Sequence, residues 1–305
     1  MGDLLSGKRR VRPDEGFLMA AVYGAASMTI FLLLGIIGYV FFRGFRIVSL
    51  RFLLSVTDSL KGTVGIGGNL VNTLYILGLT LGTAVPAGVG AAIYLNEYAK
   101  PGALVKLIDF TTETLAGIPS VIFGLFGMVF FGGVLGMGFS LISGSLTLTL
   151  MVLPLIVRNT QEALRAVPEG YRSAALGMGA GRWYMIRTVL LPDALPGILT
   201  GVLLAVGRIV GESAALLFTA GSAGLLPRQG ENIRENIGNL IGKALEPGGT
   251  LSVELYLQMQ EGSFEAAFGT GCVLILITFA VNLLFRLAAG QMKKGGGRGA
   301  VYGKQ

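Results

Sequence analysis

Three stretches of this sequence are longer and more apolar than a water-soluble fold accommodates. Gly16 to Phe42, Gly62 to Asn96 and Thr114 to Val157 contain no charged residue. A helix crosses the hydrocarbon layer of a bilayer, about 30 Å thick, with about 20 apolar residues. Only 13% of the 305 residues are charged, against roughly 25% in an average soluble domain. The chain is therefore predicted to be an integral membrane protein.

Counting the apolar runs predicts six transmembrane helices. The third run is long enough to fold back on itself, and the glycine-rich stretch Gly132 to Gly138 is the predicted turn. Ala194 to Phe218, interrupted only by Arg208 and Glu212, and Ala266 to Phe285 supply further spans. Transmembrane β-barrels need alternating polar and apolar residues, which these runs lack. The predicted fold class is all-α integral membrane.

Basic residues gather at both ends of the chain. Residues 1–15 carry four cations, and the segment from Arg286 onward carries five and no acid. Because cytoplasmic segments are enriched in Lys and Arg, both termini are predicted to be cytoplasmic, which requires an even number of spans. The exception is the first external loop, which carries four cations: Arg43, Arg46, Arg51 and Lys61.

The predicted layout follows from these spans. It comprises a cytoplasmic tail 1–15, a first transmembrane helix 16–42, an external loop 43–71, a core 72–288 with five transmembrane helices, and a cytoplasmic basic tail 289–305. In the core, 158–192 is the longest cytoplasmic connection and 220–265 is the last external loop. In that external loop, five apolar residues at helical spacing predict an amphipathic surface helix: Ile233, Ile237, Leu240, Ile241 and Ala244. It either caps the external helix ends or docks an external partner.

The cytoplasmic connection has the residues of a helical hairpin. Pro168 followed by Glu169 suits a helix start, and three glycines favour a bend after it: Gly177, Gly179 and Gly181. A second short helix is predicted over Arg182 to Leu190, halted near Pro192. The small alanine face of this hairpin fits a groove in another protein. The alternative is that the hairpin is a structural elbow between two membrane helices.

The spacing in this hairpin resembles the EAA loop of bacterial ABC-importer permeases. The matching positions are Ser173, Ala174, Ala175, Gly179 and Pro192. The resemblance implies that the hairpin is a coupling helix that seats in an ATPase subunit. Ser173 stands where the family has glutamate. Glu169, four residues earlier and so on the same helix face, is predicted to supply the missing carboxylate.

The second unusual feature is the charged pair Arg208 and Glu212 inside an apolar run. At i and i+4 they would share a helix face, and a charge at the bilayer centre costs on the order of 2.5 to 3.5 kcal/mol. They either neutralise each other or line a translocation path, where the guanidinium suits a tetrahedral oxyanion. A proton relay is disfavoured because guanidinium keeps its proton.

The sequence around this pair, Gly201 to Ala220, resembles the signature of PstA-type permeases of bacterial phosphate ABC importers, as do Gly90 to Ala99 and Ala116 to Leu125. The resemblance implies a type I, MetI-like permease core that forms half of a phosphate pathway. It also implies a homologous PstC-like permease, a PstB-like ATPase homodimer and an external PstS-like phosphate-binding protein as partners. The alternatives are a permease for another oxyanion, such as sulfate or molybdate, and a secondary transporter.

Several classes of chemistry are excluded by residues that the sequence lacks. It has no histidine, and the only near match to a phosphate-binding loop, Gly238 to Ala244, has the wrong spacing. The chain is therefore predicted to be non-catalytic, without cofactor or metal, so that ATP and magnesium belong on the partner ATPase. The basic tail suits anionic lipid rather than nucleic acid. The expected location is the bacterial inner membrane.

Overall fold

The computed structural model of the protein describes residues 13–58, 63–100, 102–227 and 232–296. Apart from one pair of short strands, the regular secondary structure there is helical. The long helices are α1 (Pro13–Gly44), α3 (Gly67–Ile93), α6 (Leu141–Arg165), α9 (Leu191–Gly211) and α13 (Phe264–Gly296). The shorter helices are α2 (Leu50–Leu54), α4 (Ala103–Ala116), α5 (Ser120–Gly127), α7 (Glu169–Gly177), α8 (Arg182–Met185), α10 (Ala214–Thr219), α11 (Ile233–Lys243) and α12 (Leu251–Gln260). Three π-helical segments are η1 (Tyr94–Tyr98), η2 (Met128–Val134) and η3 (Ile186–Leu190).

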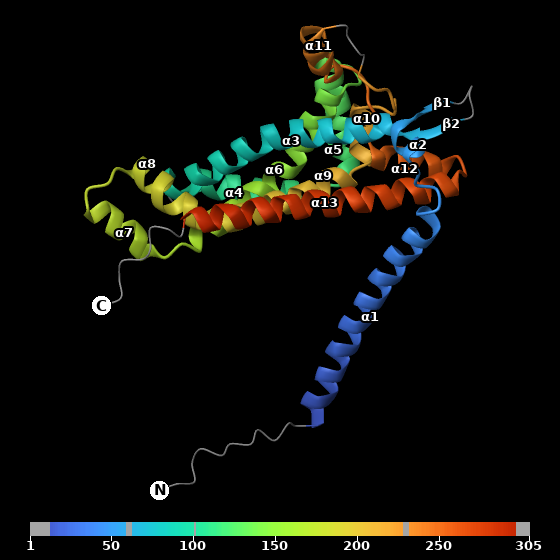
Figure 1. Ribbon diagram of the computed structural model, residues 1–305. Helices are drawn as coiled ribbons and strands as arrows, with labels where there is room; N and C mark the ends of the chain where they lie inside the picture. Colours follow the sequence, from blue (N-terminus) through green and yellow to red (C-terminus); the bar gives the residue numbers. More distant parts are fainter. Residues whose placement is uncertain (1–12, 59–62, 101, 228–231, 297–305) are drawn as a thin grey trace.

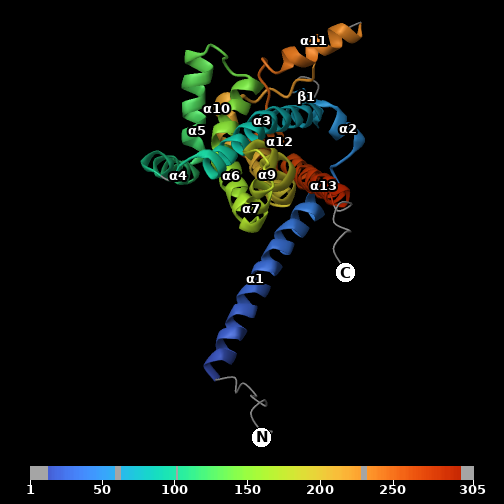
Figure 2. The same ribbon diagram turned by 90° about the vertical axis from the view of Figure 1, so that its left-hand side faces the viewer.

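Four long helices form an elongated bundle. Figure 1 shows α3, α6, α9 and α13 running lengthwise, with α7 and α8 at one end and α2, α12 and the strands at the other. Figure 2, which faces the end that carries α7, shows α4 extending to one side. Helix α1 leaves the bundle at the strand end (Figure 1), and its most apolar part buries no residue against the rest of the chain.

The core of the bundle lies around α6. Its Leu148, Val152 and Ile156 are almost completely buried and pack in one cluster with residues of α3 and α9 such as Ile76 and Ala205. Burying each such side chain contributes about 1.5 to 3 kcal/mol where the surroundings would otherwise be water. Helix α6 starts at a cap, since the Ser140 hydroxyl accepts the Ser143 amide at 3.2 Å. Because α6 is the central helix of the bundle and leads into α7, its packing determines where α7 and α8 lie.

The predicted membrane spans are confirmed, with one correction. The described residues hold five helices long and apolar enough to cross a bilayer, or six if one bent pair counts as a span. That pair is α4 with α5 and η2, bent by 102°. The third predicted span, which began at Thr114, is therefore broken at Gly117–Pro119. Pro119 caps α5, as expected of a helix start.

The segment 43–71, predicted to be an external loop, contains a feature that the sequence did not indicate. Strands β1 (Val56–Asp58) and β2 (Thr63–Ile66) pair antiparallel, with Val56 opposite Ile66 and Asp58 opposite Thr63. The glycine cluster at 65–68 is divided between two elements, because Gly65 lies in β2 and α3 begins at Gly67.

The predicted surface helix in the segment 220–265 exists as α11, but the exposure of its side chains differs from the pattern. Leu240 and Ile241, expected on the covered face, are 47% and 69% exposed, whereas Lys243 is buried and pairs with Glu246 at 3.3 Å. Hydrogen bonds from Leu141 and Ile142 hold the segment after α11 against the start of α6. At Leu240 and Ile241, therefore, the apolar side of α11 is not covered by the described part of the chain.

The termini lie partly outside the described residues. The segment 1–15, predicted to be a cytoplasmic tail, is described only from Pro13, where α1 already begins. The basic tail predicted from residue 289 is helical as far as Gly296, so its helix is longer than expected. Residues 297–305 lie outside the described part of the chain.

Candidate functional site

The connection 158–192, predicted to be cytoplasmic, contains the predicted helical hairpin. Helix α6 continues to Arg165, α7 covers Glu169–Gly177, and α8 begins at Arg182. Of the three glycines expected to bend the chain, only Gly179 takes a positive φ, of 85°. Gly177 ends α7, and Gly181 precedes α8 in an extended conformation.

Pro192 does not halt the second helix. Helix α8 continues through η3 into α9 without a break, and Pro192 occupies the first turn of α9. Proline is tolerated in a first turn, and the π-helical hydrogen bonds of η3 just before it let the chain run on despite the missing amide. The prediction that the hairpin ends at Pro192 was therefore wrong, and only 166–181 lies between the long helical segments.

The two adjacent alanines of α7 differ in exposure. Ala175 is 5% exposed and packs with Leu164, Met185, Ile186 and Leu190 in a cluster that joins α7 to α6 and η3. Ala174 and Ser173 are exposed. Three large apolar residues of the hairpin are also exposed: Tyr171, Leu176 and Met178, at 51%, 45% and 83%. The outer face of α7 is therefore available to another protein, whereas Ala175 belongs to this chain's own core.

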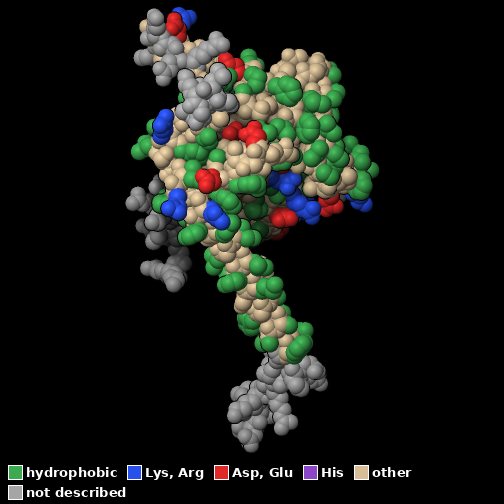
Figure 3. Space-filling view, turned by 90° about the vertical axis from the view of Figure 1, so that its right-hand side faces the viewer, with side chains coloured by type: hydrophobic (Ala, Val, Ile, Leu, Met, Phe, Trp, Pro, Cys, Tyr) green, Lys and Arg blue, Asp and Glu red, His purple; other side chains and the backbone are tan. Residues whose placement is uncertain are grey.

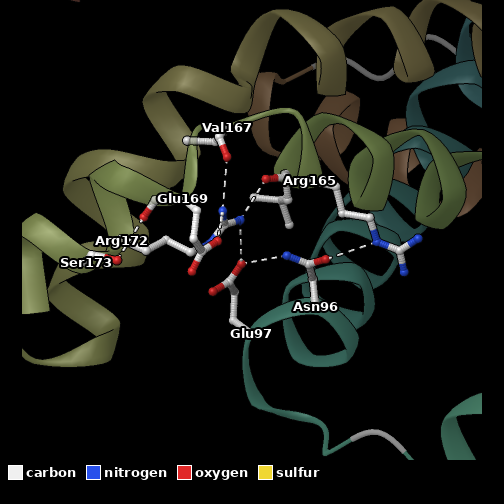
Figure 4. Close-up of polar contacts among 8 residues, drawn as sticks. Asn96, Glu97, Arg165, Val167, Glu169, Arg172 and Ser173 are labelled. Carbon is white, nitrogen blue, oxygen red and sulfur yellow. Dashed lines mark hydrogen bonds and ion pairs between the residues drawn. The ribbon is translucent and has the colours of Figure 1, made fainter.

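Arg172 holds the hairpin to the bundle. Its Nη2 atom donates to the Leu164 carbonyl at 2.8 Å and its Nη1 atom to the Val167 carbonyl at 3.0 Å. The same guanidinium pairs with Glu97 at 3.2 Å and with Glu169 at 3.1 Å. Figure 4 shows these bonds converging on Arg172 from three segments. Its side chain is 13% exposed.

The partner Glu97 lies in η1, directly after α3, and is 7% exposed. The Asn96 amide donates to the Glu97 carboxylate at 2.6 Å, and Arg165 Nε donates to Asn96 Oδ1 at 3.4 Å (Figure 4). We call Asn96, Glu97, Arg165 and Arg172 the hairpin clamp. It ties the ends of α3 and α6 to α7.

The sequence patterns did not predict this clamp. Asn96-Glu97 and Arg172 lie in segments that resemble permease motifs, but nothing in their spacing pairs residues 75 positions apart. A weak signal was the position of Glu97, directly at the end of an uncharged run of 35 residues, where a helix end in lipid favours a paired charge.

Glu169 is only partly available for the role predicted for it. Its carboxylate pairs with Arg172 but is 80% exposed, and its carbonyl accepts the Ser173 hydroxyl at 3.2 Å. Glu169 and Ser173 thus do lie one turn apart, as predicted. Whether Glu169 replaces the usual glutamate in contact with a partner stays a prediction.

Arg208 and Glu212 do not form the pair that their spacing suggested. Helix α9 ends at Gly211, so Arg208 lies in its last turn rather than mid-span, and Glu212 has an extended conformation. The Glu212 carboxylate is buried and accepts the Ala215 amide at 3.1 Å, which caps α10. Its carbonyl accepts the Ser252 hydroxyl at 2.7 Å. Mutual neutralisation was therefore the wrong interpretation.

Arg208 is exposed on α9. Among the described residues, no carboxylate lies within ion-pair distance of its guanidinium. Leu204, one turn earlier, is 53% exposed on the same side of the helix. A single unpaired charge on an apolar helix is costly against lipid. Arg208 is therefore expected to face protein or water, and its fork of donors suits an oxyanion.

Comparison with known proteins shows that this chain is similar to membrane components of transport systems. Residues 84–294 match the family model of binding-protein-dependent transport system inner membrane components. The chain is 38% identical over 205 residues to the probable ABC transporter permease protein YqgI of Bacillus subtilis, covering 67% of this chain and 70% of that protein. It is 31% identical to the phosphate transport system permease protein PstA 1 of Mycobacterium tuberculosis, covering 74% and 73%.

Solved structures agree on the fold. A chain of a bacterial alginate ABC transporter superposes with a TM-score of 0.62 at 16% identity, covering 93% of this chain and 97% of the other. The predicted all-α permease fold and the resemblance to PstA-type permeases are thus confirmed. This chain belongs to the family of binding-protein-dependent transport system inner membrane components, the membrane-spanning permeases of ABC transporters.

Proposed function

We propose that this chain is a permease subunit of an ATP-driven phosphate importer and forms half of the translocation pathway. Relatives named as phosphate permeases support phosphate as the cargo. The observation that supports a role in the pathway is Arg208. Its guanidinium is exposed in the last turn of an apolar helix and has no ion-pair partner among the described residues. It offers parallel donors to a tetrahedral oxyanion.

Coupling to ATP hydrolysis is assigned to the hairpin. The exposed face of α7, with Ser173 and Ala174, seats in a separate ATPase, which holds ATP and magnesium. The hairpin clamp passes the ATPase movement into α3 and α6, because Arg172 binds both the Leu164 carbonyl and the Glu97 carboxylate. The chain itself is non-catalytic, since its residues supply no phosphate-binding loop.

The remaining partners follow from the proposal that this chain is one permease subunit of a phosphate importer. A homologous PstC-like permease supplies the other half of the pathway, two copies of a PstB-like ATPase bind beneath, and a PstS-like protein delivers phosphate from outside. Both termini lie on the cytoplasmic side, as the concentration of Lys and Arg at the ends of the chain supports.

Phosphate uptake tests the pathway directly. Cells that depend on this importer would carry Arg208→Gln, with Leu204→Ala as the control, since Leu204 is exposed one turn away on the same face. We expect uptake to fall at least tenfold in Arg208→Gln, in keeping with about 1.5 to 3 kcal/mol for a charged hydrogen bond. Leu204→Ala should transport normally, and both proteins should reach the membrane in equal amounts.

Sulfate uptake distinguishes the alternative cargo. If Arg208→Gln leaves phosphate uptake unchanged but lowers sulfate uptake, the chain serves another oxyanion. Full uptake of both anions would contradict a pathway role for Arg208. A secondary transporter would keep its uptake when ATP is depleted and the ion gradients are maintained.

A further inference from the structure

Three arginines lie together at the end of α1 that is remote from the coupling hairpin. Arg43 is in the last turn of α1, Arg46 follows it, and Arg51 lies in α2. All three are exposed. Arg43 lies 5.7 Å from the centre of the Tyr39 ring. Within the described part of the chain, none of the three has a carboxylate at ion-pair distance.

Two adjoining cavities separate these arginines from the start of α13. One, of about 380 Å³, is lined by Phe42, Arg43, Arg46, Ile47, Phe264, Glu265 and Phe268. The other, of about 550 Å³, is lined on its α2 side by Arg51 and Phe52, and shares Ile47, Phe264 and Glu265 with the first. Both volumes fall in the range of small-ligand sites, roughly 300 to 1,000 Å³.

The cavities lie where two apolar spans end. The span of α1 is Phe17–Gly44 and that of α13 is Phe264–Leu287, and the two helices touch at Gly44. A Cβ atom on Gly44 would collide with the Phe268 carbonyl group. Figure 3 shows cationic side chains beside an acidic one where α1 joins the body of the molecule. The cluster is therefore at the edge of the hydrocarbon layer.

Large apolar side chains next to the arginines face outward. Phe42 is 79% exposed, Phe45 69% and Leu50 77%. In a chain that spans a membrane, such side chains are placed for contact with acyl chains, and the arginines beside them for contact with polar headgroups. This arrangement runs against the usual bias, because cations gather at cytoplasmic ends, and Arg43 and Arg46 lie at the opposite end of α1 from the basic N-terminal tail.

From this geometry we propose that the two cavities hold the headgroup of one anionic phospholipid. Arg43 and Arg46 donate to the lipid phosphate, which suits the fork of donors on guanidinium. Glu265, on the shared wall of the cavities, accepts hydrogen bonds from headgroup hydroxyls, which phosphatidylglycerol carries. The lipid fastens the outer end of α1 to α13. This assignment requires only that the chain spans a membrane and is independent of its cargo.

Inorganic phosphate and an acidic surface of the external binding protein share the same chemistry. The exposed Phe42, Phe45 and Leu50 favour the lipid, because neither a free ion nor a hydrophilic protein surface covers them, whereas acyl chains do. These two ligands are therefore the alternatives that the experiment separates.

Native mass spectrometry of the full-length detergent-purified chain provides the test, with phosphatidylglycerol and phosphatidylcholine as probes. Arg43→Gln combined with Arg46→Gln is compared with Arg182→Gln combined with Arg187→Gln, which removes two exposed arginines at the other end of the molecule. We expect one phosphatidylglycerol to be retained by the unaltered chain in preference to phosphatidylcholine. The first double variant should bind it about 30-fold more weakly, at about fivefold per arginine near a membrane surface.

Further measurements distinguish the lipid from inorganic phosphate and from the external binding protein. Excess inorganic phosphate should not displace the lipid, and displacement would overturn the proposal in favour of a free-ion site. Equal loss in both double variants would overturn it as a bulk charge effect. Normal lipid retention with weakened capture of the external binding protein would assign the arginines to that partner instead. Unchanged melting temperatures show that the variants are folded, and Arg43→Lys with Arg46→Lys supplies a conservative pair that should retain part of the affinity.

Discussion

The Arg172 guanidinium of α7 donates to the Glu97 carboxylate of η1 at 3.2 Å, and both side chains are almost buried. The same guanidinium reaches Glu169 at 3.1 Å, but that carboxylate is 80% exposed. One arginine thus holds two carboxylates in opposite environments. The inner pair joins the hairpin to the bundle, and the outer pair lies on the surface of α7.

This contrast predicts unequal mutational effects. Glu97→Gln leaves Arg172 without its buried partner, so we expect it to lower the free energy of unfolding by about 3 kcal/mol, the lower end for a broken buried pair. Glu169→Gln should cost at most about 1 kcal/mol. Thermal unfolding of the purified protein measures both changes in stability.

A double-mutant cycle isolates the interaction itself. Arg172→Gln also removes bonds to the Leu164 and Val167 carbonyls, so it should be the most damaging single change. Combined with Glu97→Gln, the loss should be smaller than the sum of the two single losses. Strict additivity would mean that Glu97 and Arg172 are not energetically coupled.

Adjacent alanines of α7 should respond differently to the same substitution. Ala174 is exposed and Ala175 is buried against Leu164 and Ile186. Ala174→Arg should leave the amount of membrane-inserted protein unchanged and abolish phosphate uptake, because the arginine blocks the outer face. Ala175→Arg should lower the amount of folded protein, since the cluster cannot hold a charged side chain. Full uptake in Ala174→Arg would contradict ATPase docking on this face.

How far the sequence alone leads differs between the spans and the site. Length and hydropathy predict the spans because crossing a bilayer demands about 20 apolar residues wherever they occur. The hairpin is predicted because Pro168 and the glycines after Leu176 act locally. The break at Glu212 depends on its capping bond to Ala215 and on Ser252, which lies 40 residues away. Hydropathy cannot register such a contact.

The hairpin clamp illustrates the same limit. Helical periodicity places Ala174 and Ala175 on different sides of α7, but it does not say which side packs on Leu164. That choice depends on the path of α6 and on Arg172, whose partner Glu97 is 75 residues away. The functional residues predicted from motifs are therefore local, whereas those missed are held by contacts between distant segments.

The bend of the hairpin predicts a backbone effect at one glycine. Gly179 has φ of 85° and Gly177 does not have a positive φ, yet a Cβ atom at either position would meet no atom within 4 Å. Gly179→Ala should therefore cost about 1 to 2 kcal/mol from the left-handed backbone alone. Gly177→Ala should be neutral or stabilising by up to about 1 kcal/mol. Equal melting temperatures for the two variants would show that the bend does not need glycine.

Outside the membrane spans, Glu254 of α12 predicts a dependence of stability on pH. Burial raises the pKa of this carboxyl above its ordinary value of 4.5, and repulsion from Glu261 adds to the rise. Hydrogen bonds from Gln258 at 3.0 Å and Asn69 at 3.3 Å act in the opposite direction. The folded chain therefore holds this proton more tightly than the unfolded chain does.

The sign of the effect follows from that difference. Stability contributed by protonated Glu254 is fully present below pH 4.5 and is lost as the pH rises through the folded pKa. The melting temperature of the unaltered chain should thus fall across this window relative to Glu254→Gln, which keeps an acceptor for one of the two amides. Glu261→Gln should reduce the fall without removing it, because burial is the larger cause. Parallel curves for the unaltered chain and Glu254→Gln would show that the carboxyl titrates alike in the folded and unfolded states.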